Sequence, residues 1–217
     1  MNAISLPDSA PPPLVGQQEM FGSAGDAAAI GLALQMSIAA ADPGRSNWLW
    51  VQDRRARQMT GRPFVHGLPR AFRAGLIYVA AETVADALFA LEEGLHCRDM
   101  AFVIGEMAGE ARALGFTASR RLAVASERHG VPLCLVRLDV QPALSAARRR
   151  WRVAAHPAHA DPWHVQAPGT PRWRAELFRA RDLPPAHWIV EDAGQWQRAS
   201  GGDDAAHPVD LAAQPRH

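Results

Sequence analysis

The chain has 217 residues, of which 48% are hydrophobic, and its formal net charge is only +1. A chain of this length can bury one hydrophobic core, and its near-neutral charge predicts no general attraction to nucleic acid or to membranes. All 23 basic residues are arginines, so the sequence excludes every mechanism that needs a lysine, including a P-loop lysine and a Schiff base.

The N-terminal segment and the cysteines indicate where the protein resides. The first 16 residues include three consecutive prolines and are expected to form a flexible arm. They lack the basic and apolar regions of a signal peptide, and no apolar segment reaches the roughly 20 residues that span a bilayer. Cys97 and Cys134 lie far apart in apolar surroundings and are expected to be reduced and buried. These features predict a cytoplasmic protein without membrane contact.

A glycine-containing turn follows the first extended segment. Residues 19–34, EMFGSAGDAAAIGLAL, have the order strand, turn and alanine-rich helix, which is the layout of a phosphate-binding loop. Such a loop carries lysine and Ser/Thr directly after its last glycine, because the ammonium contacts phosphate and the hydroxyl binds Mg²⁺. Here Gly22 begins the turn, and the last glycine, Gly25, is followed by Asp26 and Ala27. The sequence therefore predicts a degenerate P-loop that keeps the scaffold without its phosphate chemistry.

Downstream of this loop, apolar segments alternate with helical patterns. Continuous apolar character, typical of buried parallel strands, marks residues 47–53, 75–82, 100–107 and 131–140. Helices are expected from residue 28 to about residue 42, over 83–95, and over 118–129 before Gly130. This alternation predicts an α/β fold with a mostly parallel sheet flanked by helices.

The pattern changes in the last third of the chain. Polar and apolar residues alternate over 148–155, 171–182 and 186–192, which predicts a C-terminal antiparallel extension at one edge of the sheet. From residue 195 the sequence is polar, with Gly-Gly and Asp-Asp pairs, and is expected to be disordered. The predicted organisation is an arm over 1–16, one domain over 17–194 and a tail over 195–217.

Three histidines lie in the proline-rich segment between the first two of these predicted strands. His156, His159 and His164 flank Asp161, but their spacing matches no compact metal site. The segment is therefore interpreted as a loop, and no metal is expected.

Arginine and tryptophan alternate in two of the predicted edge strands. In an extended chain Arg148, Arg150 and Arg152 lie on one face, with a tryptophan on the other. The same alternation places Arg172 and Arg174 together in the next strand. Such rows suit the phosphates of nucleic acid and the acidic surface of a partner protein, and they are equally typical of a solvated outer face. The sequence leaves these three interpretations open.

Several of these segments together resemble the ImuA-type accessory proteins, RecA-like relatives encoded in bacterial damage-induced mutagenesis cassettes. The resemblance covers most of residues 20–192 and is carried by NWLWVQD, LIYVAAETVADALFALEEGL, AFVIGEMAG, FTASRRLAVASERHGVPLCLVR, SAARRRWRVAA, PRWRAELFRARD and WIVED. It implies a RecA-like fold without ATPase activity. It also implies action in translesion DNA synthesis with an inactive Y-family-like polymerase homologue of the ImuB type and an error-prone replicative-type polymerase. A RecA-type recombinase and single-stranded DNA are further partners that the resemblance leaves open.

The departures from active RecA-type recombinases fall on individual residues. Gly25, Asp26 and Ala27 stand where the recombinases have Gly-Lys-Thr, and Gly105 falls where they carry a magnesium-associated aspartate. Asp53 lies near the position of their catalytic glutamate, but a carboxylate without lysine or metal repels phosphates. Asp53 is therefore interpreted as a surface or helix-capping acid. The sequence predicts no catalytic residue, no cofactor and no enzymatic activity.

A second class of function shares this resemblance. Damage-induced cell-division inhibitors of the SulA type are also degenerate RecA-like proteins, and the sequence alone does not separate the two classes. A nucleotide hydrolase is disfavoured, because the lysine, the Ser/Thr and the metal-binding acid are all missing. We therefore expect a non-catalytic adaptor of damage-induced mutagenic translesion synthesis, with a division inhibitor as the alternative.

Overall fold

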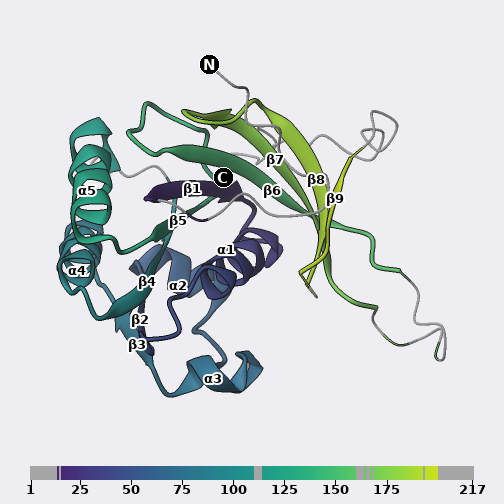
Figure 1. Cartoon of the computed structure of the whole chain (residues 1–217), viewed down its shortest axis with the longest axis horizontal. Helices are drawn as coiled ribbons and strands as arrows, with labels where there is room; N and C mark the ends of the chain where they lie inside the picture. The colour runs from purple at the N-terminus through teal and green to yellow at the C-terminus, as the bar shows by residue number, and fades with distance from the viewer. Residues whose placement is uncertain are drawn as a thin grey trace.

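The computed structural model describes residues 14, 16–109, 114–159, 164, 167, 169–192 and 194–199. Its strands form one sheet in the order β3-β2-β4-β5-β1-β6-β7-β8-β9 (Figure 1). Most of the predicted N-terminal arm and the predicted tail beyond residue 199 lie outside the described residues, as does Asp161 of the histidine-rich segment.

The parallel part of the sheet confirms the predicted α/β fold. It consists of β1 (Gln17–Gly22), β2 (Asn47–Gln52), β3 (Leu76–Ala80), β4 (Met100–Ala108) and β5 (Leu133–Leu138). The four predicted apolar strands correspond to β2 to β5, and β1 is the extended segment before the glycine turn. All nine residues of β4 are buried, because helices cover both faces of this central strand.

The helices form two layers around the sheet. They are α1 (Ala28–Ala39), α2 (Arg54–Thr60), α3 (Arg70–Arg73), α4 (Val84–His96) and α5 (Phe116–His129), with a 3₁₀ turn, η1 (Val65–Gly67). One core packs around α1 and a second packs under α4 and α5 on the opposite face (Figure 1). The helix α2 was not predicted, because it buries only Ala56 and so shows no apolar periodicity.

The C-terminal strands curve away from the parallel part. They are β6 (Arg149–His156), β7 (Arg172–Ala180), β8 (Ala186–Glu191) and β9 (Trp196–Arg198). The β6–β7 and β7–β8 pairs are antiparallel, as predicted, but β6 pairs with β1 in parallel. The first of the predicted edge strands therefore belongs to the parallel sheet and joins it to the antiparallel extension.

The strand β9 lies in the segment predicted to be disordered. Trp196 is only 2% exposed, and its ring packs 6.1 Å from Trp151 and 5.9 Å from Trp188 between centroids. Burial of a large aromatic ring offsets the entropy lost when a short polar segment becomes ordered. Three residues at the start of the predicted tail thus belong to the sheet.

The two cysteines differ in their surroundings. Cys134 is buried in β5, where burial raises the pKa of its thiol to about 12. Cys97 is exposed directly after α4, so the prediction that both thiols are buried is wrong for Cys97. Among the described residues, no helix has the length and apolar character that crossing a bilayer requires.

Candidate functional site

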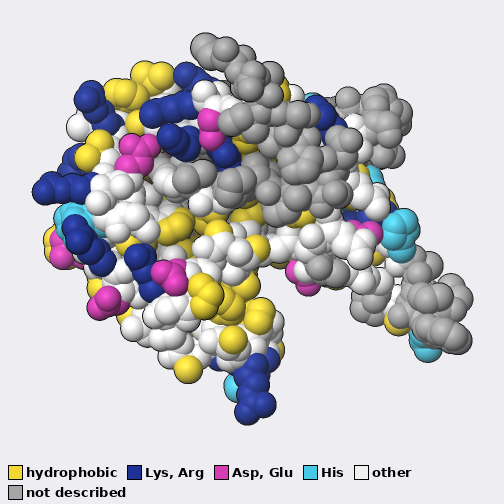
Figure 2. Space-filling model, in the orientation of Figure 1, with side chains coloured by type: hydrophobic (Ala, Val, Ile, Leu, Met, Phe, Trp, Pro, Cys, Tyr) yellow, Lys and Arg dark blue, Asp and Glu magenta, His cyan; other side chains and the backbone are white. Residues whose placement is uncertain are grey.

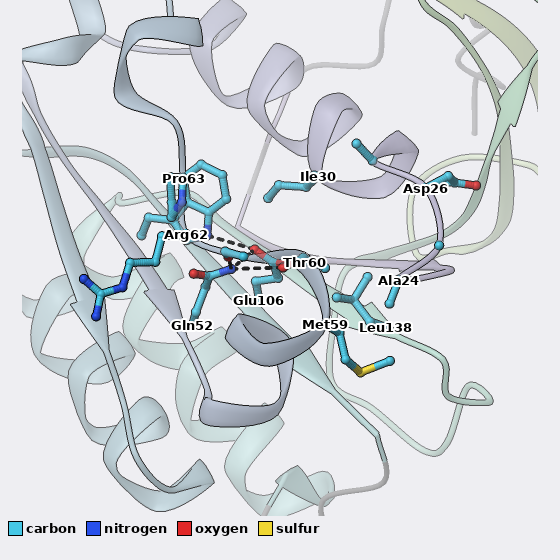
Figure 3. Close-up of a pocket in the computed structure, with 14 residues that line it drawn as sticks. Ala24, Asp26, Ile30, Gln52, Met59, Thr60, Arg62, Pro63, Glu106 and Leu138 are labelled. Carbon is cyan, nitrogen blue, oxygen red and sulfur yellow. Dashed lines mark hydrogen bonds between the residues drawn. The ribbon is translucent and has the colours of Figure 1, made fainter.

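A pocket of about 290 Å³ opens at the carboxyl ends of the parallel strands (Figure 3). Gln52 of β2 and Glu106 of β4 line one side, and the other side is the β1–α1 loop with Ala24, Gly25, Asp26 and Ala27. Open α/β sheets bind their ligands outside the carboxyl ends of the strands. The pocket therefore lies where the sequence predicted a degenerate nucleotide site.

Carboxylates of the chain itself occupy backbone donors of this loop. Asp139 Oδ1 accepts a hydrogen bond from the Ala24 N–H group at 3.2 Å, and Asp26 Oδ1 accepts one from Ala28 N–H at 2.8 Å. In a working phosphate-binding loop, backbone N–H groups at the helix N-terminus face the phosphates. A phosphate entering this loop would meet two negative charges and donors that are already engaged.

Glu106 is the buried acid of the pocket. Its carboxylate accepts hydrogen bonds from Thr60 Oγ1 at 2.6 Å, Gln52 Nε2 at 2.9 Å and Trp50 Nε1 at 3.2 Å (Figure 3). Tyr78 supports this arrangement, because its hydroxyl donates to Gln52 Oε1 at 2.7 Å. Burial raises the pKa of Glu106, although the three donors act in the opposite direction. The carboxylate therefore has hydrogen-bond partners but no cationic partner within ion-pair distance among the described residues.

Gly105 does not line this pocket. A Cβ atom there would lie 2.9 Å from Leu135 and 3.0 Å from Leu91, which belong to the core under α4 and α5. Successive residues of a strand point to opposite faces, so the residue of β4 that faces the pocket is Glu106, one position after the predicted Gly105. Sequence reasoning missed Glu106. An acid within an otherwise apolar strand was the signal that identifies it.

Two other residues predicted for this site, Asp53 and Gly22, stabilise the fold. Asp53 caps α2, because its Oδ1 accepts a hydrogen bond from Ala56 N–H at 2.7 Å. It is only 3% exposed, so the capping interpretation is right and the surface interpretation is wrong. A Cβ atom at Gly22 would lie 2.7 Å from the Ala29 Cβ, and glycine therefore permits the close approach of β1 and α1. Gly25, Asp26 and Ala27 remain as the predicted residues that line the pocket.

The first predicted arginine row is divided between buried and exposed positions. Arg150 is 4% exposed, and its Nε lies 2.8 Å from Glu19 Oε2 on β1. Arg152 is exposed and lies 3.0 Å from Glu176 on β7. Arg148 is half-buried just before β6. The prediction that Arg150 shares an exposed face with Arg148 and Arg152 is therefore wrong. The strand β6 lies in the interior of the sheet, and the buried carboxylate of Glu19 requires a partner.

The second predicted row is also engaged within the sheet. Arg172 and Arg174 of β7 are both half-buried. The Nε of Arg172 lies 3.4 Å from Glu191 Oε1, and Arg174 likewise interacts with other residues of the chain. The structure therefore gives Arg172 an intramolecular role, while contact of either arginine with DNA or a partner stays a prediction.

The division of the first row predicts unequal effects on stability. Replacement of Arg150 by alanine leaves the Glu19 carboxylate buried without its cation, so Arg150→Ala should lower the free energy of unfolding by about 3 to 5 kcal/mol. The control is Arg152→Ala, which removes an exposed pair and should cost less than about 1 kcal/mol. Urea titration of both purified variants measures the two values. Equal losses would contradict the assignment of Arg150 to the interior.

The raised pKa of Glu106 predicts a pH dependence. The folded chain holds this proton more tightly than the unfolded chain, in which the ordinary value is 4.5. The stabilisation is therefore complete below about pH 4.5 and is lost as the pH rises through the raised pKa. Because Glu106→Gln cannot ionise, the free energy of unfolding of the wild type should fall relative to this variant as the pH rises above about 4.5 and through the raised pKa of Glu106. Urea titrations at several pH values provide the measurement, with the exposed Glu127→Gln variant as control. Parallel pH profiles of the free energy of unfolding for wild type and Glu106→Gln would contradict the raised pKa of Glu106.

Two curated proteins are similar to the chain in sequence. Both are named Protein ImuA and come from Caulobacter vibrioides, strains NA1000 / CB15N and ATCC 19089 / CIP 103742 / CB 15, and each is 35% identical over 151 residues. The similarity covers 65% of this chain and 57% of each relative, so the chain spans little more than half the length of the proteins it matches. No family model matches the chain.

A solved structure of the RadB recombinase is similar in fold. The TM-score is 0.53, and the superposition covers 83% of this chain and 89% of the recombinase chain at 15% sequence identity. At that identity the likeness concerns the fold alone, a mostly parallel sheet with antiparallel strands at its C-terminal side. The chain is therefore similar in sequence to Protein ImuA over 151 residues and has a RecA-like α/β fold.

Proposed function

We propose that the chain is a non-catalytic accessory protein of damage-induced mutagenic translesion DNA synthesis. The observation that carries this proposal is the 35% identity to the ImuA proteins over 151 residues. In this function the chain is an adaptor between an inactive Y-family-like polymerase homologue of the ImuB type and an error-prone replicative-type polymerase. Each polymerase supplies its own chemistry or DNA contact, and the adaptor supplies binding surfaces.

The pocket supports an adaptor rather than a nucleotide hydrolase. The chain contains no lysine, and the carboxylates of Asp26 and Asp139 engage donors of the β1–α1 loop. Glu106 is held by three neutral donors, an arrangement that stabilises the pocket wall. Phosphoryl transfer depends on cations that neutralise developing charge, and the described part of this pocket offers Arg62 alone at its rim.

The exposed arginines remain candidates for contact with DNA or with a partner. Arg152 is the most accessible member of the first row, and its guanidinium lies 4.3 Å from the ring centroid of Phe178. A guanidinium supported by an aromatic ring is pre-organised for bidentate hydrogen bonding. We therefore assign the contact to Arg152, keep the half-buried Arg148 as a second candidate, and leave Arg150 out.

The first consequence of this function is that the chain does not bind Mg-ATP. Isothermal titration calorimetry should give a dissociation constant weaker than about 100 μM, or roughly −5.5 kcal/mol. The Asp26→Asn, Asp139→Asn double variant removes two negative charges beside the loop and should bind more tightly than the wild type. Wild-type binding below about 100 μM, or ATP hydrolysis, would be incompatible with the proposal.

The second consequence separates this function from that of a division inhibitor. Deletion of the gene should abolish most ultraviolet-induced point mutation while growth without damage stays normal, because the polymerases lose an adaptor. Overproduction of the chain alone should leave cell length unchanged, since excess adaptor can only titrate its own partners. Mutation frequency in the deletion strain and cell length in the overproducer are the measurements. Unchanged mutagenesis together with filamentous cells would instead identify a division inhibitor.

A further inference from the structure

We propose that the groove between α4 and α5 binds an acidic segment of a protein partner through an apolar anchor. The groove has a volume of about 320 Å³. Glu92 and His96 line its α4 side, and its α5 side carries Arg120, Arg121, Val124 and Arg128. Both helices lie on the face of the sheet opposite α1 (Figure 1), so this groove is separate from the pocket at the β1–α1 loop.

The groove carries an excess of positive charge. Arg121 forms an ion pair with Glu92 across the two helices. Arg120 and Arg128 are exposed, and no carboxylate of the described residues lies within ion-pair distance of either. In Figure 2, dark-blue arginine side chains gather over the side of the molecule that α4 and α5 form. Two guanidinium groups are thus available to acidic side chains of a ligand.

The same surface exposes apolar side chains. Val124 lies among the arginines of α5 and is 54% exposed. Phe116 is 43% exposed one turn before Arg120, and Phe89 is 67% exposed three residues before Glu92. Among the residues that line the groove, Val124 is the exposed apolar side chain, and the two phenylalanines lie outside this lining. Arginine beside exposed aromatic and aliphatic groups is typical of a protein interface.

These features favour a polypeptide over nucleic acid. A phosphate backbone would engage Arg120 and Arg128 but would leave the aliphatic Val124 in water. A peptide with a leucine, isoleucine or phenylalanine between acidic residues satisfies both kinds of group, because its apolar side chain covers Val124 while its carboxylates meet the arginines. The proposal rests on the adaptor function only for the identity of the cellular partner. Its peptide binding is a property of the isolated chain.

The test uses peptides selected by the full-length chain. A phage-displayed library of random twelve-residue peptides should yield sequences in which acidic residues flank one large apolar residue. The selected peptide, labelled with a fluorophore, should bind the wild type, and its affinity should fall at least about tenfold with Arg120→Glu and with Val124→Asp. Added salt should weaken the binding. Both positions are exposed, and thermal melts confirm that the variants fold.

The matched control is Arg70→Glu, which makes the same charge change at an exposed helical position on α3. Its affinity for the peptide should equal that of the wild type. An equal loss with Arg70→Glu would show a net-charge effect and overturn the proposal, as would selection of peptides without acidic residues.

A labelled 20-nucleotide oligothymidylate is measured in parallel. If Arg120→Glu abolishes its binding and spares the peptide, the groove is a nucleic-acid site and the proposal fails. If Arg120→Glu loses peptide binding while mutagenesis in cells stays normal, the partner of the groove lies outside the mutagenic complex and the groove assignment stands; failure of the adaptor function itself is read from the gene deletion.

Discussion

The buried ion pair between Glu19 and Arg150 joins the two parts of the sheet. The strand β1 is the only described strand that pairs with both β5 and β6, so all strands beyond β6 connect to the parallel core through it. On one face of this contact Glu19 accepts from Arg150 at 2.8 Å and from Ser145 Oγ at 2.8 Å. On the other face Gln18 Oε1 accepts from Trp151 Nε1 at 2.7 Å. A shift of one residue would separate both pairs and leave buried polar groups without partners, so these contacts specify the register of β6 on β1.

Two backbone donors at the β1–α1 loop, the N–H groups of Ala24 and Ala28, are used internally. The backbone of such a loop presents N–H groups that need acceptors. In this chain Asp26 and Asp139 supply carboxylate oxygens to two of them. Asp139 adopts a left-handed backbone conformation with φ of 52°, which aspartate tolerates better than most residues. The carboxylates of the chain itself thus stabilise this loop.

The sheet separates two surfaces that differ in chemistry. The pocket side carries Asp26 and the buried Glu106, with Arg62 at its rim. The groove between α4 and α5 carries exposed apolar groups and two arginines that no carboxylate of the described residues neutralises. Because one hydrogen-bonded sheet lies between these surfaces, occupation of one would leave the other accessible. An adaptor requires such an arrangement, since it has to hold two partners at the same time.

The sequence by itself determined the parts of this protein that depend on local pattern. Continuous apolar segments identified β2 to β5, glycine at residue 130 marked the end of α5, and the absence of lysine ruled out a P-loop lysine in this sequence. Tertiary structure decided the parts that depend on distant neighbours. Strand alternation alone placed Arg150 beside Arg152, but only the parallel pairing with β1 brings Glu19 to Arg150 and buries both. Glu106 faces the pocket, whereas Gly105 points to the opposite face of β4, against Leu91 of α4 and Leu135 of β5. Only the packing of helices on both sides of the sheet decides which of these two faces borders the pocket. Trp196 is ordered because Trp151 and Trp188 provide a surface for its ring, and burial of this kind is a property of the whole chain rather than of a local segment.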